Sequence, residues 1–147
     1  MSARHVHSER LHVEQIASGG QAHFGTRPWC RATFSYDADR PWEVACVFFG
    51  GDAMEVGWIF SRELLVAGLA SPTPVGEGDV KIDSDVEKMR LHLYGWDGDD
   101  RPTEWLTVVL EMPREGVDQF VRDTYRLVPD GLEVDPAIDR LINSINE

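Results

Sequence analysis

The sequence predicts a single α+β domain built on an antiparallel β-sheet of about seven strands, with two to three helices. Strand-like segments of alternating or continuous apolar residues recur along the chain, and helix-like segments fall between and after them. The chain has 147 residues, of which 42% are hydrophobic, and this suits one ordinary core. Residues 1–147 are therefore expected to form one domain, with a flexible start over residues 1–7.

Four strands are expected in the first part of the chain, over residues 9–17, 29–36, 44–49 and 54–60. In the fourth, Met54, Val56, Trp58 and Phe60 alternate, which indicates one buried face. Gly50-Gly51-Asp52 has the composition of a tight turn and predicts that the third and fourth strands form a hairpin.

A short helix is predicted over residues 61–67. The Ser61 side chain can accept a hydrogen bond from the free N–H groups that open a helix, and Phe60 and Leu65 occupy the two positions of a hydrophobic staple. We expect Gly68 to end this helix in the left-handed conformation, and the prolines that follow prevent its continuation.

Three more strands are expected, over residues 79–83, 88–94 and 104–112, with a turn at 97–100 between the last two. Pro113 fits the first turn of a second helix, whose apolar face would consist of Val117, Phe120, Val121 and Thr124. Asp135 and Pro136 would open a third helix, whose apolar stripe would consist of Ile138, Leu141, Ile142 and Ile145. A neighbouring subunit or the chain's own sheet could cover that stripe equally well.

The charge balance makes nucleic acid a poor default partner. The net charge is −12, and only residues 1–40 carry more basic than acidic side chains. Binding to a phosphate backbone draws most of its affinity from Lys and Arg. An acidic chain would need its arginines to converge, as they could in a symmetric oligomer; the candidates are Arg4, Arg10, Arg27, Arg31 and Arg40.

The chain is expected to be cytoplasmic. No apolar run approaches the roughly 20 residues that span a bilayer, and residues 1–14 do not have the pattern of a signal peptide. Cys30 and Cys46 lie in apolar strand-like segments, where thiols fill a core more often than they form a disulfide framework.

Two acidic runs invite comparison with calcium loops, and both are interpreted as solvated turns. Asp97-Gly98-Asp99 is followed by Arg101 and Pro102, where a ligand and a glycine would be needed. The run Asp83, Asp85 and Glu87 has a lysine at the glycine position. The third candidate is a trio of imidazoles, His5, His7 and His12; the first two would point the same way on a strand, but no cysteine or carboxylate completes a site. No metal is predicted.

No catalytic or cofactor constellation is predicted either. Cys46 with His92, or Ser61 with a distant histidine, could be written as nucleophile and base, but no motif supports either pair. Gly76-Glu77-Gly78 lacks the third glycine and the helix of a dinucleotide site and is interpreted as a turn.

The tryptophans are the better functional candidates, because exposed tryptophan often anchors protein interfaces. Trp58 is expected in the core. Trp42, at a strand start, and Trp96, beside an acidic turn, are the predicted partner-binding residues.

One ordered set of landmarks resembles the signature of the SsgA-like proteins, small cell-division proteins of sporulating actinobacteria. The matching residues, which we interpret as mainly structural, are Trp58, Phe60, Arg62, Glu63, Leu64, Leu65, Gly68, Leu69, Pro72, Gly76, Gly78, Asp79 and Val80. The resemblance extends upstream to Tyr36 and Asp37 and downstream to Gly131, which covers nearly the whole chain. Thr73 and Pro74 depart from the pattern as an insertion in a turn, and Asp83-Ser84-Asp85 stands where an aromatic residue and a proline often follow.

The resemblance, which is strongest to the SsgB-like branch, implies several further properties. The sheet would be strongly bent, in a fold similar to that of the Whirly single-stranded nucleic-acid-binding proteins, and the chain would assemble as a homotrimer. The function would be non-enzymatic: placement of the sporulation septum by recruiting or stabilising the FtsZ ring, with other SsgA-like proteins as further partners. The alternative, drawn from the implied fold, is a single-stranded nucleic-acid binder, which should expose aromatic residues along a basic groove.

Overall fold

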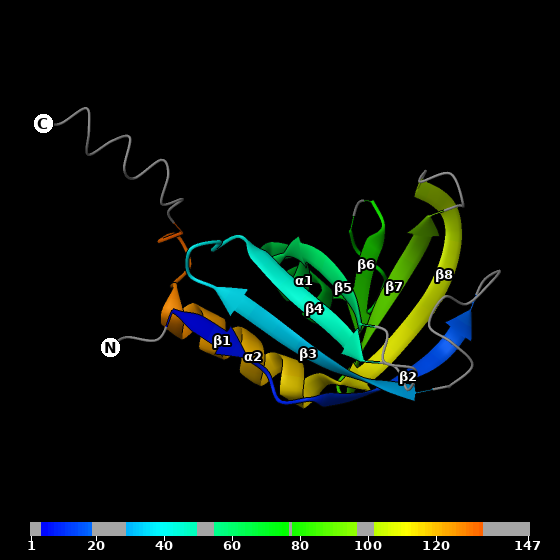
Figure 1. Cartoon of the computed structure of the whole chain (residues 1–147), viewed down its shortest axis with the longest axis horizontal. Coiled ribbons are helices and arrows are strands. Elements are labelled where there is room, and N and C mark those ends of the chain that lie inside the picture. The colour runs from blue at the N-terminus through cyan, green and yellow to red at the C-terminus, as the bar shows by residue number, and fades with distance from the viewer. Residues whose placement is uncertain (1–3, 19–28, 50–54, 77, 97–101, 134–147) are drawn as a thin grey trace, which may run out of the picture.

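The computed structural model describes residues 4–18, 29–49, 55–76, 78–96 and 102–133, which form eight strands and two helices (Figure 1). The strands are β1 (His5–His7), β2 (Leu11–Ser18), β3 (Trp29–Asp37), β4 (Glu43–Phe49), β5 (Glu55–Ser61), β6 (Val80–Ser84), β7 (Lys88–Trp96) and β8 (Pro102–Pro113). The helices are α1 (Arg62–Leu69) and α2 (Arg114–Leu127).

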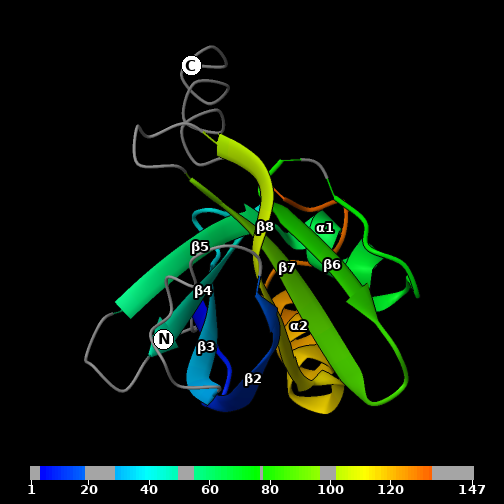
Figure 2. The ribbon, with the colours of Figure 1, turned by 90° about the vertical axis from the view of Figure 1, so that its right-hand side faces the viewer.

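All eight strands belong to one antiparallel sheet, which confirms the predicted fold class. The strand order is β5-β4-β3-β2-β8-β7-β6, and β1 pairs with β3 beside this path. The sheet is strongly bent, as Figure 2 shows, so that its end strands β5 and β6 slope away on opposite sides and α1 lies next to β6. The predicted hairpin is present as the β4–β5 pair, whereas its turn lies outside the described residues.

The start of the chain contains a strand that the sequence did not predict. His5–His7 form β1, which pairs with the last part of β3. The β2–β3 pairing reaches only as far as Leu11 and Ala32, so the edge of β3 from Ser35 to Asp37 remains open for another strand. Val6 then packs against the core. Three residues with one apolar side chain give too short a pattern for a strand to be predicted from sequence.

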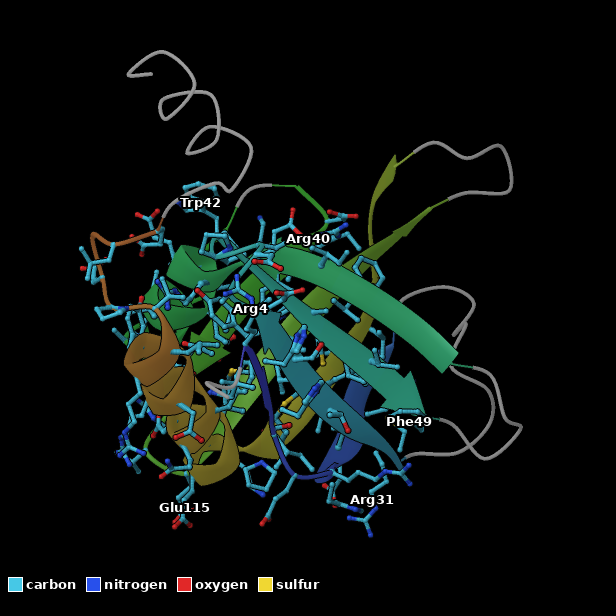
Figure 3. The ribbon with its side chains drawn as sticks, turned by 60° about the vertical axis from the view of Figure 1, so that its left-hand side comes forward. Arg4, Arg31, Arg40, Trp42, Phe49 and Glu115 are labelled. Carbon is cyan, nitrogen blue, oxygen red and sulfur yellow. The ribbon has the colours of Figure 1, made fainter. Side chains whose placement is uncertain are left out.

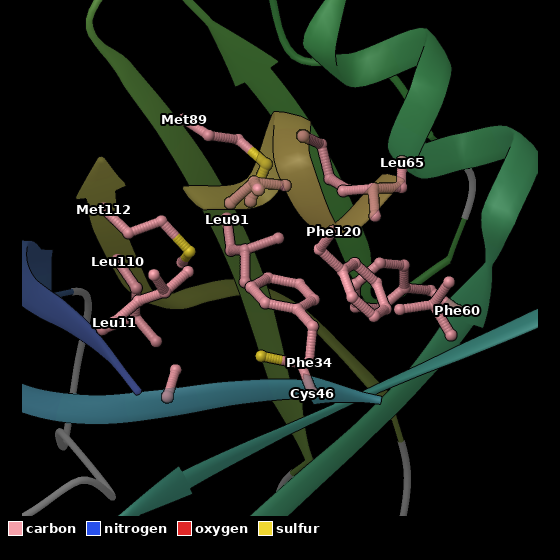
Figure 4. Close-up of a cluster of buried hydrophobic side chains, with 14 of the residues drawn as sticks. Leu11, Phe34, Cys46, Phe60, Leu65, Met89, Leu91, Leu110, Met112 and Phe120 are labelled. Atoms are coloured by element: carbon pink, nitrogen blue, oxygen red, sulfur yellow. The ribbon is translucent and has the colours of Figure 1, made fainter. Parts of the chain in front are cut away.

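The core lies between the bent sheet and the two helices (Figure 4). Phe34 of β3 is at its centre, with ring centroids 5.5 Å from Phe120 of α2 and 6.4 Å from Phe60 of β5. From the other half of the sheet, Met89, Leu91, Leu110 and Met112 complete the cluster. Val117, Phe120 and Thr124 are buried, as the predicted apolar face of α2 requires. The predicted third helix lies outside the described residues.

Helix α1 begins as predicted and ends differently. The Ser61 side-chain oxygen accepts a hydrogen bond from the Leu64 N–H at 2.9 Å, and Phe60 and Leu65 are both buried. The expectation that Gly68 ends the helix in the left-handed conformation was wrong, because the helix includes Gly68 and runs to Leu69. A Cβ atom at Gly68 would overlap the side chain of Ile82 in β6. This glycine therefore serves the close approach of α1 to the sheet.

Candidate protein-interaction surface

Arg62, a residue of the family signature, is a buried connection between the two helices. Its side chain is 2% exposed. The guanidinium donates hydrogen bonds to the carbonyl oxygens of Thr124 at 3.2 Å and Val128 at 2.8 Å, at the C-terminal end of α2. The Thr124 carbonyl also accepts a backbone hydrogen bond from the Val128 N–H at 2.9 Å, whereas the Val128 carbonyl lies beyond the helix and is satisfied by Arg62.

Three further side chains surround the Arg62 guanidinium. Glu133 forms an ion pair with the guanidinium at 2.6 Å. The Cζ atom of Arg62 lies 4.0 Å from the ring centroid of Tyr125 and 5.0 Å from that of Tyr36. The pKa of Glu133 is lowered by a backbone hydrogen bond and by Arg62, whereas burial raises the pKa of Tyr125. The sequence analysis placed Arg62 among the mainly structural signature residues but did not identify its partners. Its position directly after a helix N-cap, in an otherwise apolar segment, was the available signal.

Several signature residues meet at a hollow between the two ends of the sheet. The hollow has a volume of about 310 Å³ and is lined by Ile59, Phe60, Ser61, Leu64, Asp79 and Val80. Gly76 and Gly78 come just before Asp79 and Val80, which line the hollow on the β6 side. The φ angles of these two glycines are 135° and 87°. A side chain at either position would be strained, which explains the two glycines. We call this hollow the seam hollow.

Trp42 is exposed, as predicted for a partner-binding residue. Its side chain is 48% exposed in the turn between β3 and β4. The backbone around it is fixed, because the Trp42 carbonyl accepts a hydrogen bond from the Arg62 N–H at 2.8 Å and the Pro41 carbonyl accepts one from the Tyr36 hydroxyl at 2.8 Å. An exposed indole on a fixed turn can anchor a partner at a small entropic cost. Trp96 ends β7, but its side chain lies outside the described residues.

The outer face of β1, β3, β4 and β5 carries a second hollow, of about 330 Å³. His5 and His7 line it, and their rings stack with centroids 6.4 Å apart, so they point the same way as predicted. Within the described residues, no group of three or more His, Cys, Asp or Glu side chains is arranged to hold a metal ion.

The four described arginines of the candidate set lie at two opposite ends of the β3–β4 pair instead of forming one groove. Arg4 pairs with Asp39, and Arg40 lies 4.0 Å from Glu43, at the end that carries Trp42 (Figure 3). Arg31 lies at the opposite end beside Phe49, and the Arg10 guanidinium is 5.0 Å from the Phe49 ring centroid. Arg27 lies outside the described residues. This arrangement gives no support to the nucleic-acid alternative.

The acidic run that starts at Asp83 belongs to an ion-pair network and not simply to a solvated turn. Arg90 contacts Asp83 at 2.6 Å, Asp85 at 3.0 Å and Glu111 at 3.2 Å, and His92 also pairs with Asp83. The pKa of Asp85 is lowered to about 2 by the backbone N–H of Glu87, by Arg90 and by the backbone N–H of Lys88. The sequence pattern did not reveal that β6 and β7 place these charges side by side.

The considered nucleophile, Cys46, is fully buried, and burial raises the pKa of its thiol well above the usual value. A thiolate is therefore disfavoured at this position. His92, its considered partner, is engaged by Asp83.

Comparison with known proteins decides the family. Residues 30–133 match the family described as Streptomyces sporulation and cell division protein, SsgA. The chain belongs to the SsgA family. The predicted resemblance is thereby confirmed.

Curated relatives within the SsgA family carry a common name. The sporulation-specific cell division protein SsgB of Kineococcus radiotolerans is 35% identical over 121 residues, covering 76% of this chain and 68% of the relative. SsgB of Thermobifida fusca is 32% identical, covering 71% of each chain. SsgB of Salinispora tropica is 35% identical, covering 76% of this chain and 79% of the relative. These names support a role in sporulation-linked cell division.

Solved structures of SsgA-family proteins have the same fold. A crystal structure of an SsgA-like sporulation-specific cell division protein from Thermobifida fusca matches with a TM-score of 0.71 and 27% identity, covering 99% of both chains. A structure from a study of SsgB mutations and longitudinal cell division in Streptomyces coelicolor matches with a TM-score of 0.66 and 26% identity, covering 90% of this chain and 98% of that one.

Neither described helix is long and apolar enough to cross a membrane.

Proposed function

We propose that this chain is a non-enzymatic adaptor of sporulation-specific cell division that helps to position the septum by recruiting or stabilising the FtsZ ring. The observation that carries the proposal is the set of relatives named sporulation-specific cell division protein SsgB, which are 32% to 35% identical over about three quarters of the chain. The protein would act in the cytoplasm, at the division septum.

Trp42 is the proposed centre of the partner-binding surface. Its exposed indole stands on a turn that Arg62 and Tyr36 hold in place, so binding requires little reorganisation. Partners would be FtsZ, other SsgA-like proteins and further copies of the chain in a homotrimer. A trimer presents three copies of one surface, and weak contacts at each copy add through avidity.

The test is FtsZ binding by the purified protein, with its assembly mass measured by light scattering. We expect saturable binding, a mass of three times the 16.6 kDa chain, and at least a tenfold loss of affinity in Trp42→Ala. Val86→Ala is the matched control, because Val86 is also an exposed apolar residue and lies in the β6–β7 turn.

A single-stranded oligonucleotide, tested at two salt concentrations, supplies the contrary outcome. Salt-sensitive oligonucleotide binding without FtsZ binding would overturn the adaptor proposal in favour of a nucleic-acid function. Equal FtsZ affinity in Trp42→Ala and Val86→Ala would instead reject Trp42 as the contact.

A further inference from the structure

The two end strands of the sheet differ in how their outer edges are covered. Beside β6, Val75 exchanges two backbone hydrogen bonds of 2.9 Å with Ile82, and Ser71 accepts one of 2.9 Å from the Ser84 N–H. Beside β5, no backbone hydrogen bond from the described residues reaches the outer edge. Among the residues that the structure describes, the sheet thus has one covered edge and one open edge.

The alternation of hydrogen-bonded pairs between β4 and β5 shows which N–H and C=O groups of β5 do not bond to β4. Arg62 donates its N–H to the carbonyl of Trp42, the pair that directly continues the register of Glu43 with Ser61. Hydrogen-bonded pairs alternate along an antiparallel ladder, so the N–H and C=O groups of Gly57 and Ile59 point away from β4. Both residues are exposed, Ile59 to 62%.

Strand β5 also lacks the features that normally protect an edge. It contains no lysine or proline, and its register with β4 runs without a bulge from Glu43 opposite Ser61 to Phe49 opposite Glu55. Natural proteins use such residues and bulges to stop a further strand from pairing. A regular and mainly apolar edge of seven residues is suited to accept one.

The seam hollow lies against this edge and indicates what a guest strand would carry. Phe60, Leu64 and Val80 form apolar walls for a side chain that projects inward. Asp79 is the charged residue of the lining, and no ion pair to it is found among the described residues. Glu63 is exposed on the neighbouring helix.

We propose that the open edge of β5 binds an extended segment of a partner protein as an additional strand, with an apolar side chain in the seam hollow and a lysine or arginine beside Asp79. A partner protein is favoured over a second copy of this chain as the occupant, because the edge strand of a second copy, β5, contains no lysine or arginine to complement Asp79. The inference deepens the proposed adaptor function by giving the chemistry of the partner segment. Its test contains no FtsZ, so that the two proposals fail separately.

The test uses a synthetic nine-residue peptide of alternating lysine and valine, with both ends blocked, titrated into the isotopically labelled full chain. We expect the largest NMR shifts, and slowed hydrogen exchange, at the amides of Gly57 and Ile59. Gly57→Pro should weaken binding at least tenfold, because it removes an N–H that points outward and takes no bond from the β4 ladder. Gly57→Ala is the matched control, since its Cβ meets nothing within 4 Å and its N–H is retained.

A second pair of variants covers the case in which Gly57→Pro disturbs folding. Ile59→Lys places a charge on the open edge and should abolish binding, whereas Ile16→Lys makes the same change at an exposed position of β2 and should not. The peptide should also lose affinity when its lysines are replaced by glutamates, because Asp79 then repels it.

Three results would overturn the proposal. One is equal binding by a peptide N-methylated at every residue, which has no N–H group to donate to the edge of β5. Another is a set of shifts that avoids β5. The third is protection of the Gly57 and Ile59 amides in the free protein that disappears on dilution, because a second copy of the chain would then be the occupant.

Discussion

Arg62 connects the first turn of α1 to the last turn of α2 through hydrogen bonds to Thr124 and Val128. A single side chain therefore fixes the relative position of two helices that are far apart in sequence. Arg90 plays a comparable part in the sheet, where it contacts carboxylates on β8 and at the end of β6. Both are charged residues that join separate elements of the fold through several polar contacts each.

Replacing Arg62 by methionine should destabilise the protein by about 3 kcal/mol, because it leaves the Val128 carbonyl without the donor that Arg62 supplies and removes the largely buried ion pair to Glu133. Urea unfolding monitored by tryptophan fluorescence measures the change. Arg126→Met is the control, since Arg126 is an exposed arginine with a surface ion pair to Asp123, and should stay within about 0.5 kcal/mol of the wild type. Similar losses in both variants would show that the buried hydrogen bonds of Arg62 contribute little.

Asp85 should make stability depend on pH in a predictable direction. Its pKa is about 2 in the folded protein, below the ordinary value near 3.8, so its contribution is present above pH 4 and disappears as the pH falls towards 2. The difference in unfolding free energy between the wild type and Asp85→Asn should therefore shrink as the pH falls from 5, which is above both pKa values, towards 2. A constant difference over that range would contradict the prediction.

The sequence predicted the structural role of a single residue correctly where that role depends only on the residue itself and its neighbours along the chain. Trp42 is exposed, and Ser61 caps α1, as predicted. Arg62 and the network around Arg90 were missed because their partners are supplied by other elements. Sequence spacing does not give such distances.

At the scale of the elements, the apolar patterns predicted seven of the eight described strands and both described helices. Strand β1 was missed, because its pairing depends on the edge that β2 leaves open on β3. Gly68 was assigned to the helix end because glycine is common there, but the packing of α1 on Ile82 determines its place. Tertiary contacts override local preference at both positions.

Gly68→Ala tests that packing. Alanine favours a helix over glycine by about 1 kcal/mol, yet we expect a net loss of about 2 kcal/mol, because the added methyl group overlaps Ile82. Urea unfolding gives the value, with Gly57→Ala as a control in which the methyl group enters open space. A stabilised Gly68→Ala protein would show that helix propensity outweighs the contact.

At the scale of the whole molecule, the bent sheet surrounds one core, and its end strands β5 and β6 do not pair. The central strands are bonded on both sides, whereas β5 is bonded to β4 alone. The strong bend was expected from the family resemblance and is confirmed by the structure. Its similarity to the Whirly fold stays a prediction.

Hydrogen exchange should reflect this difference along the sheet. Backbone amides of Leu91 and Leu110, in β7 and β8, should exchange only through global unfolding, because both residues lie in the core between paired strands. The outward amides of Gly57 and Ile59 should exchange orders of magnitude faster in the free monomer. Uniform exchange rates along the sheet would contradict the open edge.

Gly68 also determines the width of the seam hollow. Leu64 on α1 and Val80 on β6 are two of its walls, and their separation depends on how closely the helix approaches the strand. A residue that no partner touches therefore acts as a spacer that sets the size of the side chain the hollow accepts. Substitution at this buried position would change whether the hollow prefers a small or a large apolar side chain from the proposed guest strand, without altering any surface contact.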